Sequence, residues 1–363
     1  MIAYLIRRSL ELLVVLFFSS LAIFTILNMV PGGPLSGLRF QQTRGVTSGQ
    51  QIQENIKRLE RFYDLDLPAS IRYTRWLVGW PKTDDDPIFR AVRPVFNWPE
   101  LGERPIPGGM IFGDMDESWT VAKAQPVFDL IKSRLGNTLL LMTSAVVLSL
   151  VVAIPIGVIS AVRQYSKFDY LATTAAFFGN SMPVFWFGLL MIMFFAFTLP
   201  RWGLPGLPTG NAYSLRGAGA GSIPDHLQHL VMPTIVLSLL YMAGWSRFTR
   251  SSMLEVLGED YVRTARAKGL REGIVIGRHA FQNALIPLVT IVTLQIPGIF
   301  GGAILTETVF NWPGMGRLYI NALSQSDWPV VMALLFVTAV LVVLANLVAD
   351  VLYTVVDPRI TYT

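Results

Sequence analysis

Few residues in this chain could do chemistry, and two of its three histidines are the most suggestive. His226 and His229 follow Asp225 at i,i+3 spacing, which would place both imidazoles on one face of a helix. A zinc site needs at least a third protein ligand, and none beyond Asp225 is evident. The chain has no cysteine, which excludes thiolate ligands and disulfides. We therefore interpret the pair as the polar start of an apolar helix and expect no metal, cofactor or catalytic site.

The positions of the carboxylates argue against an ion-coupled transporter, and the lack of a phosphate-binding motif argues against an ATP-binding enzyme. An ion-coupled secondary transporter needs ionisable residues near the middle of the membrane. Glu11, Glu307 and Asp350 lie instead near the ends of apolar runs, so this class is kept only as the alternative. The chain also lacks G-x-x-x-x-G-K-[ST], the loop that cradles ATP phosphates. We expect it to be no enzyme and to receive any ATP-derived energy from a partner.

The polar stretch GEDYVRTARAKGL, at 258–270, has the features of a docking helix. Acids stand at its start, where the helix dipole favours negative charge. Gly269 can adopt the left-handed conformation that ends a helix. A helix of about ten residues is unstable alone in water, so it needs a surface to pack on. A solvated connector is the competing interpretation. The expected docking residues are Glu259, Asp260, Tyr261, Val262, Arg263, Ala265, Arg266 and Gly269.

Long apolar runs must position this stretch. The chain is 52% hydrophobic and only 15% charged, with a mean hydropathy of +0.50. Uncharged apolar runs of about 18 residues or more indicate membrane-spanning helices. We predict an all-α polytopic membrane protein with six spans at 12–30, 135–162, 170–200, 227–246, 283–306 and 328–349.

The distribution of positive charge predicts the topology. Twelve Lys and Arg fall in the termini and loops on one side, against three in the short loops on the other. The positive-inside rule then places both termini and the loop 247–282 in the cytoplasm. The expected organisation is a cytoplasmic N-terminus and first span at 1–30, an external segment at 31–132, and a five-span core at 133–363.

The long segment between the first two spans is expected to form a small cap outside the membrane. Helical spacing of apolar residues predicts a helix over 50–63. Residues 81–110 are dense in proline and turn residues, which predicts an irregular surface excursion.

The third and fifth spans contain residues that break helices. They are Gly179, Pro183 and Gly188 in the third, and Pro287, Pro297, Gly298, Gly301 and Gly302 in the fifth. Breaks at membrane depth are tolerated where the backbone lines a cavity, although small residues also serve close helix packing. We predict that these spans line a pathway, with Asn180, Ser181 and Gln295 facing it. Hydrogen bonding between helices is the equally good account of these three residues.

Several stretches together resemble one family. Residues 260–287 are similar to the "EAA" cytoplasmic loop of ABC-importer permeases, in the form DYVRTARAKGL…RHAxxNALIP of the dipeptide/oligopeptide permease family. YLIRR at 4–8, PGGP at 31–34, RLERFYDLDLPASIRYTRWL, PVFDLIKSRLGNTLLL, TETVFNWPGMGRLYINAL with DWP, and NLVADVLYTVVDPRI resemble other parts of that family in the same order. The resemblance covers nearly the whole chain.

The resemblance implies a permease subunit with the type I ABC importer fold, in the cytoplasmic membrane of a prokaryote. The implied partners are ABC ATPase subunits, a second homologous permease, an external solute-binding protein and membrane lipid, with no nucleic acid. In the implied docking, Tyr261, Val262 and Ala265 enter a cleft of the ATPase, while Arg263 and Arg266 meet acids at its rim. The substrate could be a dipeptide, an oligopeptide, a peptide antibiotic or a nickel chelate, and the second permease identical or a sister chain.

Three departures from the family pattern stand out. Arg263 replaces the usual Glu of the loop motif, and Ser326 replaces the usual Arg before the DWP aspartate. The 81–110 excursion resembles an insertion, and its role stays open.

Overall fold

The computed structural model describes residues 2–29, 54, 57–58, 60–217 and 219–356. The described residues form helices joined by turns and loops, and they include no β-strand beyond one isolated bridge between Glu117 and Pro126. The all-α prediction is therefore confirmed.

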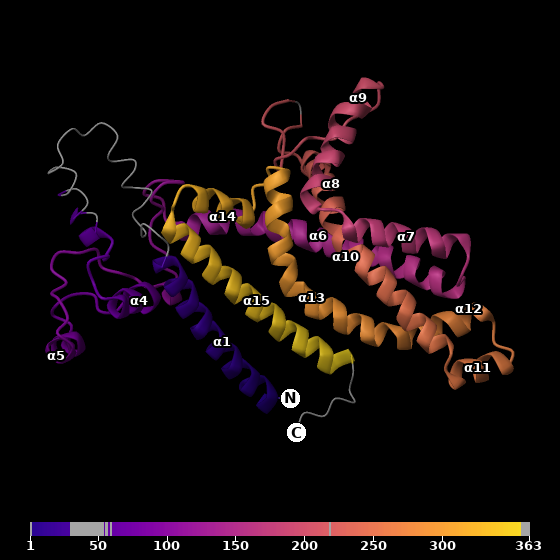
Figure 1. Ribbon diagram of the computed structural model, residues 1–363, viewed down its shortest axis with the longest axis horizontal. Coiled ribbons are helices and arrows are strands. Elements are labelled where there is room, and N and C mark those ends of the chain that lie inside the picture. Colours follow the sequence, from indigo (N-terminus) through magenta and orange to yellow (C-terminus); the bar gives the residue numbers. More distant parts are fainter. Residues whose placement is uncertain (1, 30–53, 55–56, 59, 218, 357–363) are drawn as a thin grey trace. The chain divides into compact units, whose positions relative to one another are not determined.

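Six helical segments are long and apolar enough to cross a membrane, as predicted. The helices that supply them are labelled in Figure 1. They are α1 (Ile2–Asn28), α6 (Val127–Val162), α8 (Val184–Met191) continuing to α9 (Leu199–Arg201), α10 (Ile223–Leu257), α12 (Glu272–Ile274) continuing into α13 (Gln282–Val309), and α15 (Trp328–Val356).

The third apolar run divides in two, as its proline predicts. Helix α7 (Lys167–Ser181) ends at Met182, and α8 begins after Pro183. Proline disfavours helical conformation in the residue before it and has no N–H for a helix bond. Glycines 179 and 188 stay inside their helices, so the only break among the three predicted positions is at the proline. Residues 192–198 then continue as a π-helix (η2), and the candidate span is 184–201.

The fifth run is not broken, contrary to our expectation. Helix α13 continues from Gln282 to Val309 through both prolines and all three glycines. A membrane helix tolerates such residues when neighbouring groups satisfy the freed carbonyls. The irregularity lies earlier, in the π-helix η3 (Val275–Phe281) that connects α12 to α13.

The chain forms two compact units. The first unit comprises residues 1–133 and 318–340, and the second comprises 134–317 and 341–363. The first contains α1, α4 (Ala69–Val78), α5 (Pro87–Phe96) and a short 3₁₀ turn at Met110–Phe112. The second contains α7 to α13. Helices α6, α14 (Met315–Ser324) and α15 each continue from one unit into the other.

The first unit has a small apolar core in the segment after α1. Leu67, Ile71, Phe89 and Leu101 are buried together, with Trp80 and Trp98 against them. Residues 81–110 therefore differ from the irregular excursion that their composition predicted, because they contain α5. The Asp86 carboxylate caps this helix by accepting from the N–H groups of residues 88 and 89, and a proline occupies its first position.

Arg75 joins the parts of this small core. Its side chain is 2% exposed and donates to the Asp64 carboxylate at 2.5 Å and to the carbonyls of Pro81 and Pro105 at 2.5 and 2.9 Å.

The predicted helix over 50–63 falls partly outside the described residues. Of its described residues, 54, 57–58 and 60–62 are helical, and residue 63 lies in a turn.

A buried carboxylate also anchors the loop before α6 within the first unit. Asp327 has no exposed surface and accepts hydrogen bonds from the Ser118 hydroxyl at 2.6 Å and from the N–H groups of Thr120 and Val121, both at 2.9 Å. All five of its hydrogen-bond donors come from the four consecutive residues 118–121. The aspartate of the DWP sequence is therefore a structural anchor, since its oxygens are occupied by the chain itself.

Candidate functional site

The polar stretch between the fourth and fifth spans forms the predicted helix. Helix α11 runs from Asp260 to Ala267, with Glu259 at the N-cap position and Lys268 at the C-cap. Gly269 follows with φ +74°, and its N–H donates to the Arg266 carbonyl at 2.9 Å. The left-handed conformation expected at Gly269 is confirmed, and it turns the chain toward α12.

The inner face of α11 is covered by the chain itself. Val262 and Ala265 are 0% and 5% exposed, and they pack with Val275 of η3 against Val256 and Leu257 at the end of α10. The docking surface that a short helix needs is therefore supplied from within. Our expectation that Val262 and Ala265 enter a cleft of a partner is corrected, because neither side chain is accessible.

The charged residues of α11 also pair differently from the expectation. Arg266 forms an ion pair with Glu272 at 2.8 Å, across the Gly269 turn, and this hydrogen bond raises the pKa of Arg266. Arg263 Nη1 lies 3.5 Å from an Asp260 carboxylate oxygen, and both side chains are strongly exposed. Exposed pairs of this kind contribute little to stability, so these charges are available to a partner.

The outer face of α11 is both polar and aromatic. Tyr261 is 43% exposed, and partial burial together with the charge of Glu259 raises the pKa of its hydroxyl. Two apolar side chains of the following turn, Leu270 and Ile274, are 40% and 45% exposed. Tyr261, although next to Val262 in sequence, faces away from the covered side. The aromatic and apolar side chains of this surface are therefore accessible from outside the chain.

The histidines fix a loop to the start of α10. His226 Nδ1 donates to the Ala212 carbonyl at 2.7 Å, and its ring lies 5.5 Å from both Tyr213 and Trp312. His229 Nδ1 donates to the Gly210 carbonyl at 2.6 Å. Both imidazoles therefore have structural partners, and no group of His, Asp and Glu among the described residues could hold a metal.

Glu307 is a buried residue whose role sequence reasoning missed. Its carboxylate has no exposed surface and accepts from the Thr138 hydroxyl at 2.7 Å and from the Arg317 N–H at 3.0 Å. A Cβ added at Gly314 would overlap this carboxylate, and one at Gly316 would overlap the Ile304 backbone and approach the carboxylate. The spacing of glycines in PGMG was the available signal, since it indicates close approach of a backbone to another group.

The structure describes the side chains of two of the three predicted pathway residues. Asn180 and Ser181 are exposed in the last turn of α7, directly before the break at Pro183. The Ser181 hydroxyl donates to the Phe177 carbonyl of its own helix at 2.9 Å. Gln295 lies in α13, and its side chain is outside the described part of the structure.

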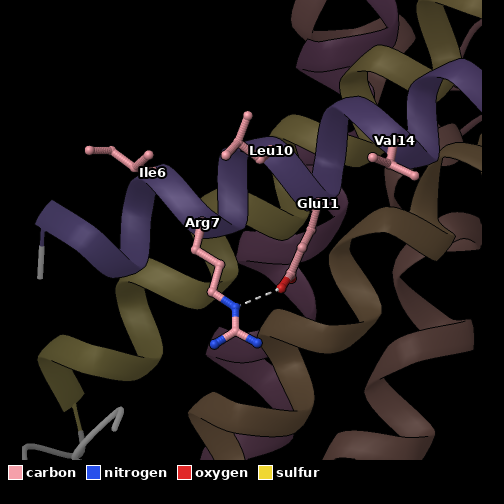
Figure 2. A pocket seen from close by; sticks show the side chains of 5 residues that line it. All are labelled: Ile6, Arg7, Leu10, Glu11 and Val14. Carbon is pink, nitrogen blue, oxygen red and sulfur yellow. Dashed lines mark ion pairs between the residues drawn. The ribbon is translucent and has the colours of Figure 1, made fainter.

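A hollow along α1 is not built as a binding site. Figure 2 shows its lining residues, which all project from the first turns of this one helix: Ile6, Arg7, Leu10, Glu11 and Val14. Its polar groups are an exposed i,i+4 ion pair, with Arg7 Nε 3.4 Å from a Glu11 oxygen. Its apolar residues are more than half exposed, as expected for a surface that faces lipid or another helix.

Six candidate spans, with a short polar helix between the fourth and the fifth, define a polytopic membrane protein. Residues 153–362 match the family described as "Binding-protein-dependent transport system inner membrane component". The chain belongs to this family, which makes it a membrane component of an ABC transporter. Because the chain belongs to this family, the alternative class, an ion-coupled secondary transporter, is excluded.

Similarity to known relatives extends over the full length. The chain is 39% identical over 362 residues to the oligopeptide transport system permease protein AppB of Bacillus subtilis, covering 100% of both chains. It is 41% identical over 273 residues to the dipeptide transport system permease protein DppB of Escherichia coli, covering 70% of this chain and 78% of the relative. Among solved structures, the inward-facing MetNI methionine ABC transporter aligns with a TM-score of 0.49 at 16% identity, over 63% of this chain and 96% of the other.

Proposed function

We propose that this chain is the permease subunit of an ATP-driven importer that moves peptides or peptide-like solutes across the cytoplasmic membrane of a prokaryote. The full-length similarity to relatives named for oligopeptide and dipeptide transport supports the substrate class. The predicted topology puts both termini and α11 in the cytoplasm, and residues 31–132 outside. The fold in this proposal is the type I permease fold.

The observation that carries the proposal is the two-sided character of α11. Its inner face is buried against α10 and η3, while Tyr261 and Arg263 stand exposed on the other side. An isolated helix of eight residues would not hold its shape, but one mounted on its own chain can receive a partner without first folding. The outer face of α11, with Glu259 and Asp260 at its start, docks the ATPase subunits.

The other partners follow from the same assignment. A second homologous permease completes the pathway, with Asn180, Ser181 and Gln295 facing the solute. An external solute-binding protein delivers the substrate to the side that carries residues 31–132. ATP is bound and hydrolysed by the ATPase subunits.

Co-purification of the ATPase subunits with variants of the outer face tests the docking. Tyr261→Ala removes an exposed aromatic ring of a type enriched in binding hot spots, so ATPase association should weaken by roughly tenfold. Tyr261→Phe, which keeps the ring, is the matched control and should retain association. If the alanine variant holds the ATPase subunits as firmly as the unaltered chain and transports normally, α11 is only a connector between spans.

A further inference from the structure

A partly buried ion pair joins two helices of the second unit, near the ends that the predicted topology places in the cytoplasm. Asp169 lies in the first turn of α7 and is 3% exposed. Its two carboxylate oxygens accept from Arg250 of α10, at 2.7 Å from Nε and 2.8 Å from Nη2. Such a two-pronged arrangement fixes orientation as well as distance, because the planar guanidinium matches the carboxylate.

The same carboxylate holds the turn that leads into α7. It accepts from the Tyr165 N–H at 3.0 Å, and Tyr165 has φ +62°, a conformation that non-glycine residues seldom adopt. The Ser166 hydroxyl in turn caps the helix by accepting from the Asp169 N–H at 3.2 Å. The start of α7 is therefore locally fixed, and the Arg250 side chain ties this end of the helix to α10.

Arg250 also stands close to the mount of α11. It lies seven residues before the end of α10, about 10 Å along the helix at roughly 1.5 Å per residue. Val256 and Leu257, in the final turn, cover the inner face of α11. A displacement of α11 would therefore move the end of α10 first. One to two turns further along α10 it would move Arg250, and with it the bound Asp169 carboxylate of α7.

Helix α7 leads from this pair to the predicted pathway residues. It runs beside α10 in the opposite direction (Figure 1), with Arg247 lying 4.8 Å over the Phe177 ring and Gly179 close to Leu239. It ends in the exposed Asn180 and Ser181, immediately before the break at Pro183. A break of this kind lets α7 move without carrying α8 rigidly with it.

We propose that Asp169 and Arg250 are positioning residues that transmit the displacement of α11 to α7, and so to the end of α7 that carries Asn180 and Ser181. This inference rests on the proposed ATPase docking at α11. The pair contacts neither solute nor nucleotide, and it acts by making α7 follow α10. A pair that only held the fold together would support assembly without affecting how much solute moves per ATP.

The transporter reconstituted in liposomes, with its ATPase subunits, sister permease and binding protein, tests the proposal. Arg250→Lys keeps the charge and loses the two-pronged contact, and Asp169→Asn keeps the shape and loses the charge. Lys167→Gln removes an exposed charge two residues away in the same turn and serves as the control. Peptide uptake and ATP hydrolysis are measured together, with co-purification and thermal unfolding of each assembly.

We expect both variants to assemble and hydrolyse ATP, while the ATP consumed per peptide rises by about tenfold, within the range reported for residues that carry coupling. The double variant Asp169→Asn/Arg250→Gln should be no worse than the single ones, because all three lose the same connection. The control should match the unaltered chain. An unchanged ratio of peptide to ATP in both single variants overturns the proposal. The proposal is also overturned if uptake falls only in parallel with lost assembly or with a lowered unfolding temperature, because the pair then serves only to stabilise the fold.

The unaltered chain separates this inference from the function on which it rests. If it assembles with the ATPase subunits and couples transport to hydrolysis while the variants do so equally well, only the inference fails. If the ATPase subunits do not associate through α11 at all, both fail.

Discussion

The packing of α11 against α10 and η3 leads to a quantitative prediction about a single buried side chain. Val262 has no exposed surface, and it packs on Val275 and on the last turn of α10. Val262→Ala removes the equivalent of two buried methylene groups, at about 0.8 kcal/mol each. The cavity left in a partly rigid surrounding adds to this, and we expect a total of about 2–3 kcal/mol.

The quantity affected is the free energy of detaching α11 from α10 and η3. A loss of about 2–3 kcal/mol corresponds to roughly 30-fold to 150-fold in the equilibrium between attached and detached helix. Hydrogen exchange of the α11 backbone amides reports this local opening directly. The measurement is made on the permease chain in a lipid nanodisc, without ATPase subunits, so that no partner can protect the helix.

Arg263→Ala is the matched control, since it shortens an exposed side chain of the same helix and alanine is a good helix former. Its α11 amides should exchange within about threefold of the unaltered chain. If Val262→Ala also leaves exchange within that margin, the inner face of α11 does not hold the helix in place. The assignment of a self-mounted docking helix is then refuted.

Three further predictions concern the topology and the anchors. In this cysteine-free chain, an impermeant thiol reagent should label Thr83→Cys in intact cells and Lys268→Cys only after permeabilisation, and the reverse pattern would invert the topology. Gly314→Ala should sharply lower the yield and the unfolding temperature of the purified chain, because its methyl group would overlap a fully buried carboxylate; normal stability would contradict the close approach. The hydrogen bond to Arg104 holds the pKa of Asp66 below its usual range. The ionised Asp66 therefore contributes its full stabilisation above the usual pKa range of an aspartate, and this contribution is lost as the pH falls through the lowered pKa. The fall in unfolding temperature on acidification should consequently be smaller in Asp66→Asn.

The six spans could be predicted from the sequence because lipid imposes a composition that needs no tertiary information. The third run also showed where it would divide, since proline acts on its immediate neighbours. The same reasoning failed in the fifth run. There Pro287 and Pro297 lie inside a continuous α13, and whether freed carbonyls find other partners depends on surroundings that the local sequence does not specify.

The sequence predicted where α11 ends, but it did not predict what covers the apolar face of this helix. Gly269 marks where α11 stops because a left-handed residue is a local requirement. The spacing of Val262 and Ala265 indicates an apolar face but not what covers it. That partner is Val275, which comes only after the Gly269 turn and becomes a neighbour once the chain has folded back. The same limit applies to Asp169 and Arg250, which are 81 residues apart and have no local signal connecting them.

The self-mounted α11 changes what a docking partner can contribute. If Val262 and Ala265 entered a cleft of the ATPase, apolar burial would supply the affinity, and each docking event would have to order the helix as well. Since the chain covers these side chains itself, the partner meets an ordered helix with Tyr261 and exposed charges. Exposed charges affect association rate and specificity more than affinity. The proposed transporter should then hold its ATPase mainly through the aromatic and apolar part of this surface, and force applied there passes into α10 because the covered face joins the two helices.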